Sequence, residues 1–129
     1  MVTDNIGDFI IRLKNANLVG KESVSIYTSK IKESVADALV RAGFVKSFSK
    51  NKNGKTLEVV LAYNEDKTPR ITDVSRISKP SRRIYKSVSE LKPAANRIGL
   101  MIISTPAGVL SNKEAYKQKV GGEVMFKIW

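Results

Sequence analysis

Residues 99–110 read Gly99-Leu-Met-Ile-Ile-Ser-Thr-Pro-Ala-Gly-Val-Leu110, and this stretch is the most informative part of the chain. Its apolar run predicts a strand from Leu100 to Ser104 that stops in a Ser-Thr-Pro-Ala-Gly turn. A second turn, Gly121-Gly122-Glu123, leads into the last predicted strand. Hydroxyls, a rigid proline and glycines at strand ends let another molecule's backbone come within hydrogen-bonding distance. The stretch therefore predicts a binding surface at the end of a sheet.

Composition limits the class of protein. With 129 residues, 42% of them hydrophobic, the chain can bury a core as one compact domain or two small subdomains. No apolar run approaches the roughly 20 residues that a membrane helix needs. The start, Met1-Val2-Thr3-Asp4, shows no basic segment followed by an apolar one, so no secretory signal is visible. The absence of cysteine fits a reducing cytosol, and we expect a cytoplasmic protein.

The charge of the chain is strongly positive and unevenly spread. The formal net charge is +11, which predicts polyanionic partners through long-range attraction and counterion release. Residues 1–77 hold 13 basic against 9 acidic residues, whereas residues 78–129 hold 10 against 3. Solubility alone is the alternative explanation, but it needs a net charge of only about 2 to 8 in a small domain.

The first subdomain is predicted to span residues 1–77 with the order α-β-α-β-β-β. Apolar residues at helical spacing predict a first helix capped by Thr3 or Asp4, and a second helix capped by Thr28 or Ser29 that ends at Gly43. Strands are expected around residues 23–27, 44–49, 57–63 and 70–77, with Asn53-Gly54 as a tight turn.

The second subdomain is predicted to span residues 78–129 and to be mainly β with short helices, so the fold class is α+β. Ser78-Lys79-Pro80-Ser81 is the expected linker, because proline bars both helix and central strand. A short strand from Arg82 to Lys86 follows. Two capping boxes, Ser87 with Glu90 and Ser111 with Glu114, predict helical turns near residues 91–97 and up to about residue 118. Residues 124–128 alternate as a terminal strand.

Catalysis is poorly supported by the sequence. The chain has neither His nor Cys, so the commonest general base and the best nucleophile are missing. No cluster has metal-ligand spacing and no phosphate-binding glycine loop occurs, so we expect no cofactor and no metal. An enzyme that uses Ser104 or Thr105 with a lysine base is the remaining catalytic alternative.

RNA binding is better supported. Double-stranded RNA exposes 2′-hydroxyls and base edges in a wide, shallow groove, and small polar groups on a firm platform can read them. Ser104 and Thr105 supply hydroxyls, Pro106 stiffens the turn, and Gly108 permits close approach. Tyr85 can stack on a base or ribose while its basic neighbours bind phosphates. These neighbours are Arg82, Arg83 and Lys86.

Each of these features also has a purely structural interpretation. Ser104-Thr105-Pro106 can simply end a strand, Tyr85 can belong to the core, and Gly121-Gly122 can be an ordinary turn. Glu123 stands out in a basic neighbourhood. It is expected either to accept hydrogen bonds and brace the Ser-Thr turn or to pair with a lysine.

Several motifs together resemble the small-subunit ribosomal protein eight family, bacterial type. The matching pieces are residues 99–103, Ser104-Thr105-x-x-Gly108-Val109-Leu110, Lys113-Glu114-Ala115, Gly121-Gly122-Glu123, Arg83-Ile84-Tyr85-Lys86, Ser29-Lys30-Ile31-Lys32, Gly43-Phe44-Val45, and Asp4-Asn5-Ile6-Gly7-Asp8 leading to Arg12-Leu13-Lys14-Asn15. The chain departs from the pattern at Pro106 and Ala107, where many members have Ser-Lys or Ser-Gln. A third hydroxyl is therefore missing.

The resemblance implies a structural protein of the small ribosomal subunit that binds the central domain of its rRNA and helps assemble the platform. It implies that the C-terminal subdomain makes the main RNA contact, through Ser104, Thr105, Gly108, Tyr85, Gly121, Gly122 and Glu123. It implies a second contact by the N-terminal subdomain, through Asp4, Arg12, Lys14, Ser29, Lys30, Lys32 and Lys55. Small-subunit ribosomal proteins five and twelve are the implied protein partners. The alternatives are a translational repressor that binds its own messenger RNA and a general basic nucleic-acid-binding protein, such as a nucleoid-type DNA binder.

Overall fold

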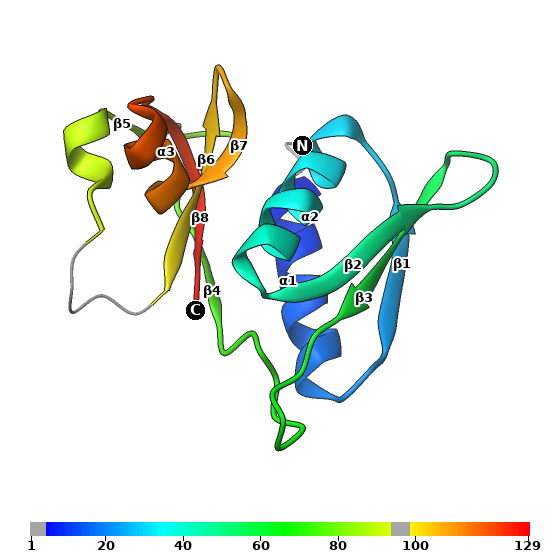
Figure 1. Ribbon diagram of the computed structural model, residues 1–129. Helices are drawn as coiled ribbons and strands as arrows, with labels where there is room; N and C mark the ends of the chain where they lie inside the picture. Colours follow the sequence, from blue (N-terminus) through cyan, green and yellow to red (C-terminus); the bar gives the residue numbers. More distant parts are fainter. Residues whose placement is uncertain (1–4, 94–98) are drawn as a thin grey trace. The chain divides into compact units, whose positions relative to one another are not determined.

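The computed structural model describes residues 5–93 and 99–129. They form two compact units, Asn5–Asp73 and Val74–Trp129, each with its own antiparallel sheet and helices (Figure 1). The predicted α+β class is therefore confirmed. The units divide four residues before the boundary expected from the sequence.

The N-terminal unit packs two helices on one side of a three-stranded sheet (Figure 1). Its elements are α1 (Asn5–Leu18), β1 (Ser23–Tyr27), α2 (Lys30–Ala42), β2 (Val45–Lys50) and β3 (Thr56–Leu61). The sheet order is β1-β3-β2, so β1 and β2 are both edge strands. The predicted apolar stripe of α1 is buried as expected. The fully buried side chains of this unit include Ile10, Leu13, Val35, Leu39, Leu57 and Val59.

Local sequence signals fix the ends of α2. The Ser29 hydroxyl accepts a hydrogen bond from the Lys32 N–H at 3.3 Å, as an N-cap does. Gly43 ends the helix at φ 84°, a left-handed conformation that glycine adopts without a Cβ penalty. Both features were predicted from the sequence.

A buried asparagine ties α1 to the loop that follows β3. The Asn17 amide donates to the Ala62 carbonyl at 3.1 Å, and its oxygen accepts from the Ile71 N–H at 2.9 Å. Both partners are backbone groups more than 40 residues away in the chain. Because a buried amide needs such partners, Asn17 fixes the path of residues 62–71 against the helix.

The C-terminal unit is built around its last strand. Its elements are β4 (Val74–Arg76), β5 (Tyr85–Lys86), the 3-10 helix η1 (Val88–Leu91), β6 (Leu100–Thr105), β7 (Gly108–Ser111), α3 (Asn112–Gln118) and β8 (Gly122–Ile128). β8 pairs with β4, β5 and β6, and β6 also pairs with β7. Helices α3 and η1 lie next to each other on one side of this sheet (Figure 1). A core cluster fills the space between them and the strands: Leu91, Met101, Ile103, Leu110, Ala115 and Val124.

Two predictions about the connections were wrong, and one strand was not predicted. The strand expected at residues 70–77 shrinks to β4, which pairs with β8 and so belongs to the C-terminal sheet. Ser78 is not in a linker: it is fully buried, and its hydroxyl accepts from the Ile84 N–H at 2.8 Å. The hairpin strand β7 was missed because Gly108–Ser111 is short and follows a turn signal.

Both predicted capping boxes are present, but one helix was misplaced. Ser111 and Glu114 open α3, and Ser87 and Glu90 open η1. The turn opened by Ser87 ends at Leu91, before Pro93, whereas a helix near residues 91–97 was expected. Residues 94–97 of that prediction, and the predicted cap at Thr3 or Asp4, lie outside the described residues.

Candidate nucleic-acid interface

Three neighbouring strands of the C-terminal unit place Tyr85, Glu123 and Ser104 side by side. Tyr85 of β5 lies opposite Glu123 of β8, and Glu123 lies opposite Ser104 of β6. Residues directly opposite in an antiparallel pair project from the same face of the sheet, so the three side chains form one row. Tyr85 is 69% exposed, which rules out the core interpretation. We call these three residues the Tyr85 row.

Gly121 and Gly122 allow the start of β8 to fit between β5 and β6. A Cβ at Gly122 would lie 2.1 Å from the Ser104 carbonyl oxygen, and one at Gly121 would lie 2.6 Å from the Lys86 carbonyl oxygen. Both distances are shorter than real Cβ contacts, and the obstacles are backbone atoms. The two glycines are therefore required by the sheet itself, and they bring the members of the row together.

Glu123 pairs with an arginine rather than with a lysine or with the Ser-Thr turn. The Arg83 guanidinium donates to its carboxylate, with 3.1 Å between Nη1 and Oε2. The Glu123 side chain is only 18% exposed, whereas that of Arg83 is 53% exposed. Arg83 thus neutralises the acid in the middle of the row and leaves much of its own planar group open to solvent.

The turn between β6 and β7 holds the Thr105 hydroxyl inside the protein's own hydrogen bonds. Thr105 lies opposite Gly108, with Pro106 and Ala107 as the turn residues. The hydroxyl donates to the Gly108 carbonyl at 2.8 Å and accepts from the Ala107 N–H at 3.1 Å. A hydroxyl has one proton, so Thr105 cannot also donate to a ligand. The Ser104 hydroxyl makes no hydrogen bond to any residue in the described part of the chain.

Two further predicted basic residues, Arg82 and Lys86, lie close to Tyr85 in the chain. Arg82 is exposed next to a tight turn, where its N–H and carbonyl bond to Lys79 at 2.9 and 2.8 Å. Lys86 is half-buried and lies opposite Gly122.

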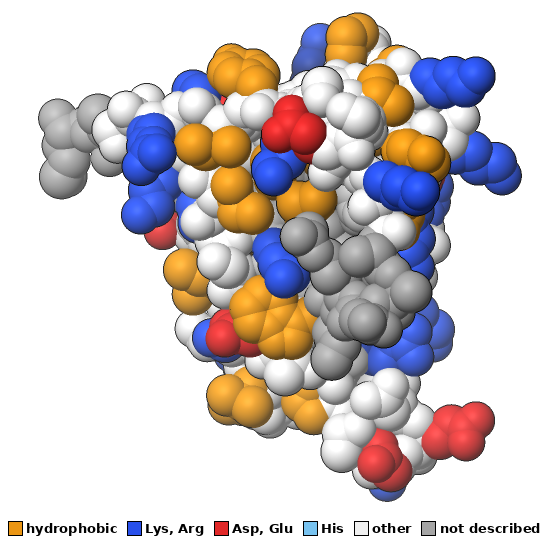
Figure 2. All heavy atoms as spheres, turned by 90° about the vertical axis from the view of Figure 1, so that its left-hand side faces the viewer, with side chains coloured by type: hydrophobic (Ala, Val, Ile, Leu, Met, Phe, Trp, Pro, Cys, Tyr) orange, Lys and Arg blue, Asp and Glu red, His pale blue; other side chains and the backbone are white. Residues whose placement is uncertain are grey.

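The opposite face of the sheet from the row is covered by η1 and α3, because Ile103 and Val124, the neighbours of Ser104 and Glu123, lie in the core cluster. On that side of the C-terminal unit too, Lys and Arg side chains are spread over the surface, with few acidic ones among them (Figure 2). Of the residues predicted for the second subdomain, the structure thus places Tyr85, Glu123 and Ser104 on one face of the sheet, whereas the Lys86 side chain projects from the other face because it follows Tyr85 in β5.

The predicted residues of the N-terminal unit fall into two groups. Ser29, Lys30, Lys32 and Lys55 gather at the end of β1: the Lys32 ammonium donates to the Tyr27 carbonyl at 3.0 Å, and the Thr28 N–H donates to the Lys55 carbonyl at 3.0 Å. The Ser29 hydroxyl is used as the cap of α2.

Arg12 and Lys14 leave α1 in different directions. The Lys14 ammonium lies 2.8 Å from the Asp73 carboxylate, whereas Arg12 lines a groove between α1 and β1. Residues two apart on an α-helix point about 200° apart, so one contact surface cannot use both. Asp4, which was predicted with them, lies outside the described residues.

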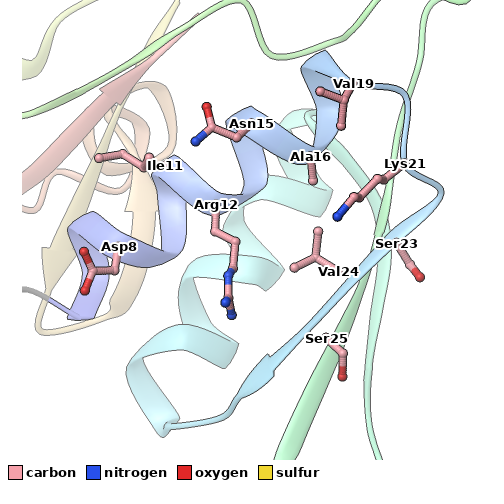
Figure 3. A pocket seen from close by; sticks show the side chains of 10 residues that line it. All are labelled: Asp8, Ile11, Arg12, Asn15, Ala16, Val19, Lys21, Ser23, Val24 and Ser25. Atoms are coloured by element: carbon pink, nitrogen blue, oxygen red, sulfur yellow. The ribbon is translucent and has the colours of Figure 1, made fainter.

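The groove runs between α1 and the β1 edge of the sheet (Figure 3). Its volume is about 590 Å³, and the side chains of Arg12 and Lys21 both point into it. A second hollow of about 400 Å³ shares Asp8 and Arg12 with it and extends to Tyr27 and Lys32. We call the two hollows together the α1–β1 groove.

Tyr27 was missed as a candidate by the sequence reasoning. It is 78% exposed, more than any other large hydrophobic residue in the described part of the chain. Tyr27 alternates with the apolar Ile26, so the sequence pattern accounted for it as an ordinary strand residue. The available signal was an aromatic residue on the outer face of that strand, two positions before a Ser-Lys pair.

Comparison with known proteins matches this architecture to one family over nearly its whole length. The family model described as Ribosomal protein S8 matches residues 4–129. The chain belongs to the ribosomal protein S8 family. It is 44% identical over 131 aligned positions to the small ribosomal subunit protein uS8 of Helicobacter pylori, covering 100% of both chains. It is 45% identical to the protein of the same name from Leuconostoc mesenteroides, covering 99% of this chain and 98% of the relative.

Two further observations describe this S8-family chain. Its described residues contain no group of three or more His, Cys, Asp or Glu side chains that could hold a metal ion. No helix in residues 5–93 or 99–129 is both long and apolar enough to cross a membrane.

Proposed function

We propose that this protein binds the rRNA of the small ribosomal subunit mainly through the Tyr85 row and the turn that ends β6. As a member of the S8 family, the chain is a structural protein of the small subunit in the cytoplasmic ribosome. The observation that carries the more specific proposal is the row itself: an exposed aromatic ring, an acid neutralised by Arg83 and an unbonded hydroxyl lie on adjacent strands.

Tyr85, Ser104 and the neighbouring basic residues have distinct tasks in this proposal. The Tyr85 ring can stack on an unpaired base or a ribose, which is sequence-tolerant and favourable by about 1 to 3 kcal/mol per base. The Ser104 hydroxyl can donate to a base edge or a 2′-hydroxyl in the shallow groove of an RNA helix. Arg82, Arg83 and Lys86 supply phosphate contacts, which give affinity but no selectivity.

The hydrogen bonds of the Thr105 hydroxyl change which residues of the turn we expect to contact RNA. Its hydroxyl fixes the hairpin, so the donors offered to RNA are Ser104 and the cations around it. Pro106 occupies the place of the third hydroxyl in many relatives, and it stiffens the turn instead of contacting a base. We therefore place the selective contacts at Ser104 and Tyr85.

The finer partners follow from the family resemblance. We propose an irregular helix in the central domain of the rRNA as the target, bound early in platform assembly, with small-subunit proteins five and twelve as neighbours. We propose that the chain has no enzymatic activity of its own. Repression of its own messenger RNA is the second candidate, because a messenger that folds like the rRNA site would fit the same row.

A binding experiment tests the main proposal. Affinity of the full chain is measured for a central-domain rRNA fragment and for an unrelated RNA duplex of equal length, at several salt concentrations. Tyr85→Ala should weaken rRNA binding by about 1 to 3 kcal/mol and leave duplex binding nearly unchanged. Tyr85→Phe should retain most of the rRNA affinity, and Tyr116→Ala serves as the control on an exposed tyrosine of α3.

Equal affinity of the wild-type protein for both RNAs would overturn the proposal. Preference for rRNA that survives Tyr85→Ala would move the selective contact away from the row. Binding of the messenger fragment with the same Tyr85 dependence would support the second candidate as well.

A further inference from the structure

We propose that Asn53 is a site of covalent modification, at which the Asn53-Gly54 pair loses ammonia and becomes aspartate or isoaspartate without an enzyme. The sequence predicts this pair as a tight turn, and the structure places it between β2 and β3. The inference goes beyond the proposed function and does not depend on it, because the reaction needs only the protein and water.

The reaction is an attack of the backbone on the side chain before it. The Gly54 amide nitrogen loses its proton to hydroxide and bonds to Cγ of Asn53. The Cγ–Nδ2 bond breaks, the side-chain amide takes a proton from water and leaves as ammonia, and a succinimide ring remains. Water then adds to either ring carbonyl and opens the ring. The product is aspartate with the normal backbone or isoaspartate, in which the chain passes through the side chain.

The turn leaves the reacting atoms open to water. Residues 51–55 are all exposed, and the loop that contains them extends beyond the sheet (Figure 1). A Cβ at Gly54 would meet no atom within 4 Å, so the space around the attacking nitrogen is free. Among the asparagines of the sequence, only Asn53 is followed by glycine. Any other residue in that place would put a side chain beside the nitrogen and hinder ring closure.

A hydrogen bond within the turn favours the attack. Oδ1 of Asn53 accepts from the Lys55 N–H at 2.9 Å, which keeps the side chain folded over the Gly54 peptide. Negative charge develops on this oxygen as the ring closes, and a donor that is already directed at it stabilises that charge. Lys52 and Lys55 flank the pair in the sequence, and their positive charges favour the deprotonated Gly54 nitrogen.

One hydrogen bond opposes the reaction. The Gly54 N–H donates to the Asn51 carbonyl at 3.0 Å, and this bond must break before the nitrogen attacks. Because the turn is exposed, water can take the place of the carbonyl, and such an exchange of partners costs little free energy. The rival interpretation is that this bond protects the nitrogen and that the pair serves only as a turn.

Asn51 is an internal control two positions before Asn53. Its Oδ1 accepts from the Asn53 N–H at 2.9 Å, so its side chain has the same kind of bond and is also exposed. It is followed by Lys52, whose side chain stands beside the nitrogen that would attack. Asn17 is a second control, because it is buried and both atoms of its amide are hydrogen-bonded. We expect modification at Asn53 and not at these two residues.

The modification changes the charge of the hairpin. Residues 50–55 contain three lysines and no acid, a formal charge of +3, and the new carboxylate lowers it to +2. Isoaspartate also lengthens the backbone within the turn, which disturbs the bond between the Gly54 N–H and the Asn51 carbonyl. Molecules of different age should therefore differ in the charge and the geometry of this hairpin.

Ageing of the purified full chain tests the inference. The folded protein is kept in mildly alkaline buffer, sampled over time and cleaved after glutamate, so that one peptide, residues 34–58, carries both Asn51 and Asn53. Fragmentation in the mass spectrometer should assign a gain of about 1 Da to Asn53, and a protein isoaspartate methyltransferase should label the same peptide. The rate at Asn53 should exceed that at Asn51 by about tenfold or more, a difference of about 1.4 kcal/mol in the barrier.

Two substitutions exchange the roles of the neighbouring residues. Gly54→Ala puts a methyl group beside the nitrogen, touches no other atom and should slow the reaction at Asn53 by about tenfold. Alanine at a φ of 70° can loosen the turn, so Lys52→Gly provides the independent test. It removes the side chain that hinders Asn51 and should raise the rate there to within about threefold of the rate at Asn53.

Two outcomes would overturn the inference. Equal rates at Asn53 and Asn51 in the folded wild type would show that the following glycine gives no advantage. Modification of Asn53 in urea-unfolded chains but not in folded ones would show that the Gly54 hydrogen bond protects the site, as the rival interpretation states. Neither experiment contains RNA, so the proposed function stands or falls separately.

Discussion

The Tyr85 row and the α1–β1 groove present the same chemistry, an exposed tyrosine among cations, on opposite kinds of support. The row stands on three hydrogen-bonded strands that approach closely enough to exclude a Cβ at Gly122. The groove lies between a helix and an edge strand, and its cations are long, flexible side chains. Pre-organised groups lose little entropy on binding and can select a shape, whereas flexible cations supply affinity that salt weakens. Under the proposed function, we therefore expect selectivity from the C-terminal unit, and from the N-terminal unit only affinity that depends on salt.

The largest expected effect is a loss of stability in the C-terminal unit, where the strands of the row are tightly packed. Gly122→Ala would force a Cβ against the Ser104 carbonyl, and we expect a loss of about 3 kcal/mol or more in the free energy of unfolding. Urea unfolding followed by the fluorescence of Trp129, the single tryptophan, measures it. Gly20→Ala in the N-terminal unit is the control: its Cβ meets nothing, and only the positive φ of 81° costs about 1 kcal/mol. Equal small losses would show that the strands are not tightly packed.

The next prediction concerns two hydroxyls that the sequence assigned to RNA. Thr105 braces the β6–β7 turn and Ser29 caps α2, so each Ala substitution should lower the free energy of unfolding by about 1 kcal/mol. Thr105→Ser and Ser29→Thr keep the hydroxyl and should restore most of it in chemical denaturation. A loss of rRNA affinity without a loss of stability would show that these hydroxyls contact RNA, and that their bonds within the protein do not explain their role.

A smaller effect is expected on the affinity for unrelated RNA, and it tests whether Glu123 contributes to selectivity. Glu123→Gln releases Arg83 from its carboxylate, so unrelated duplex RNA should bind a few-fold more tightly, with the salt slope steeper by about 0.9. Stability should change by less than about 1 kcal/mol because the pair is partly exposed. Filter binding at several salt concentrations gives both values. Unchanged duplex binding would mean that Arg83 already reaches phosphate while paired.

The smallest expected effect compares one exposed carboxylate in each unit. The backbone N–H and then the hydroxyl of Ser87 lower the pKa of Glu90, and the hydroxyl and then the N–H of Thr68 lower the pKa of Asp66. A pKa lower in the folded than in the unfolded state stabilises the fold above the unfolded value, and this contribution disappears as pH falls through the folded value. NMR titration of both carboxyl groups should show the depressed values. Glu90→Gln should remove the acid-induced shift of the Ser87 amide and leave that of Thr68 intact.

Local signals predicted most of the fold. Both caps of α2 and both capping boxes depend on residues within four positions of each other, so the sequence reveals them directly. The placement of β4 failed because its partner, β8, lies about 50 residues further along the chain. Ser78 was taken for a linker residue because nothing nearby in the sequence indicates that it is buried against Ile84.

The candidate site was predictable in membership but not in arrangement. Motifs identified Tyr85, Ser104 and Glu123 separately, and only strand register shows that they form one row. Thr105 was predicted for its hydroxyl and Ser29 through the family resemblance, and the hydroxyls of both already form hydrogen bonds within the protein. Tyr27 was overlooked because a residue's exposure at the end of an edge strand depends on tertiary structure.

The pair of glycines at the start of β8 has a consequence for how such a protein can change over time. β8 can pair with β5 and β6 only if Gly121 and Gly122 carry no side chain. A substitution at either glycine would therefore disturb the sheet before it could change what the surface binds. Sequence drift can therefore replace the basic residues near the row one at a time, but it cannot replace the two glycines on which the strand pairing depends. A lineage that binds a new target would have to change the side chains next to the row, while Gly121 and Gly122 stay glycine.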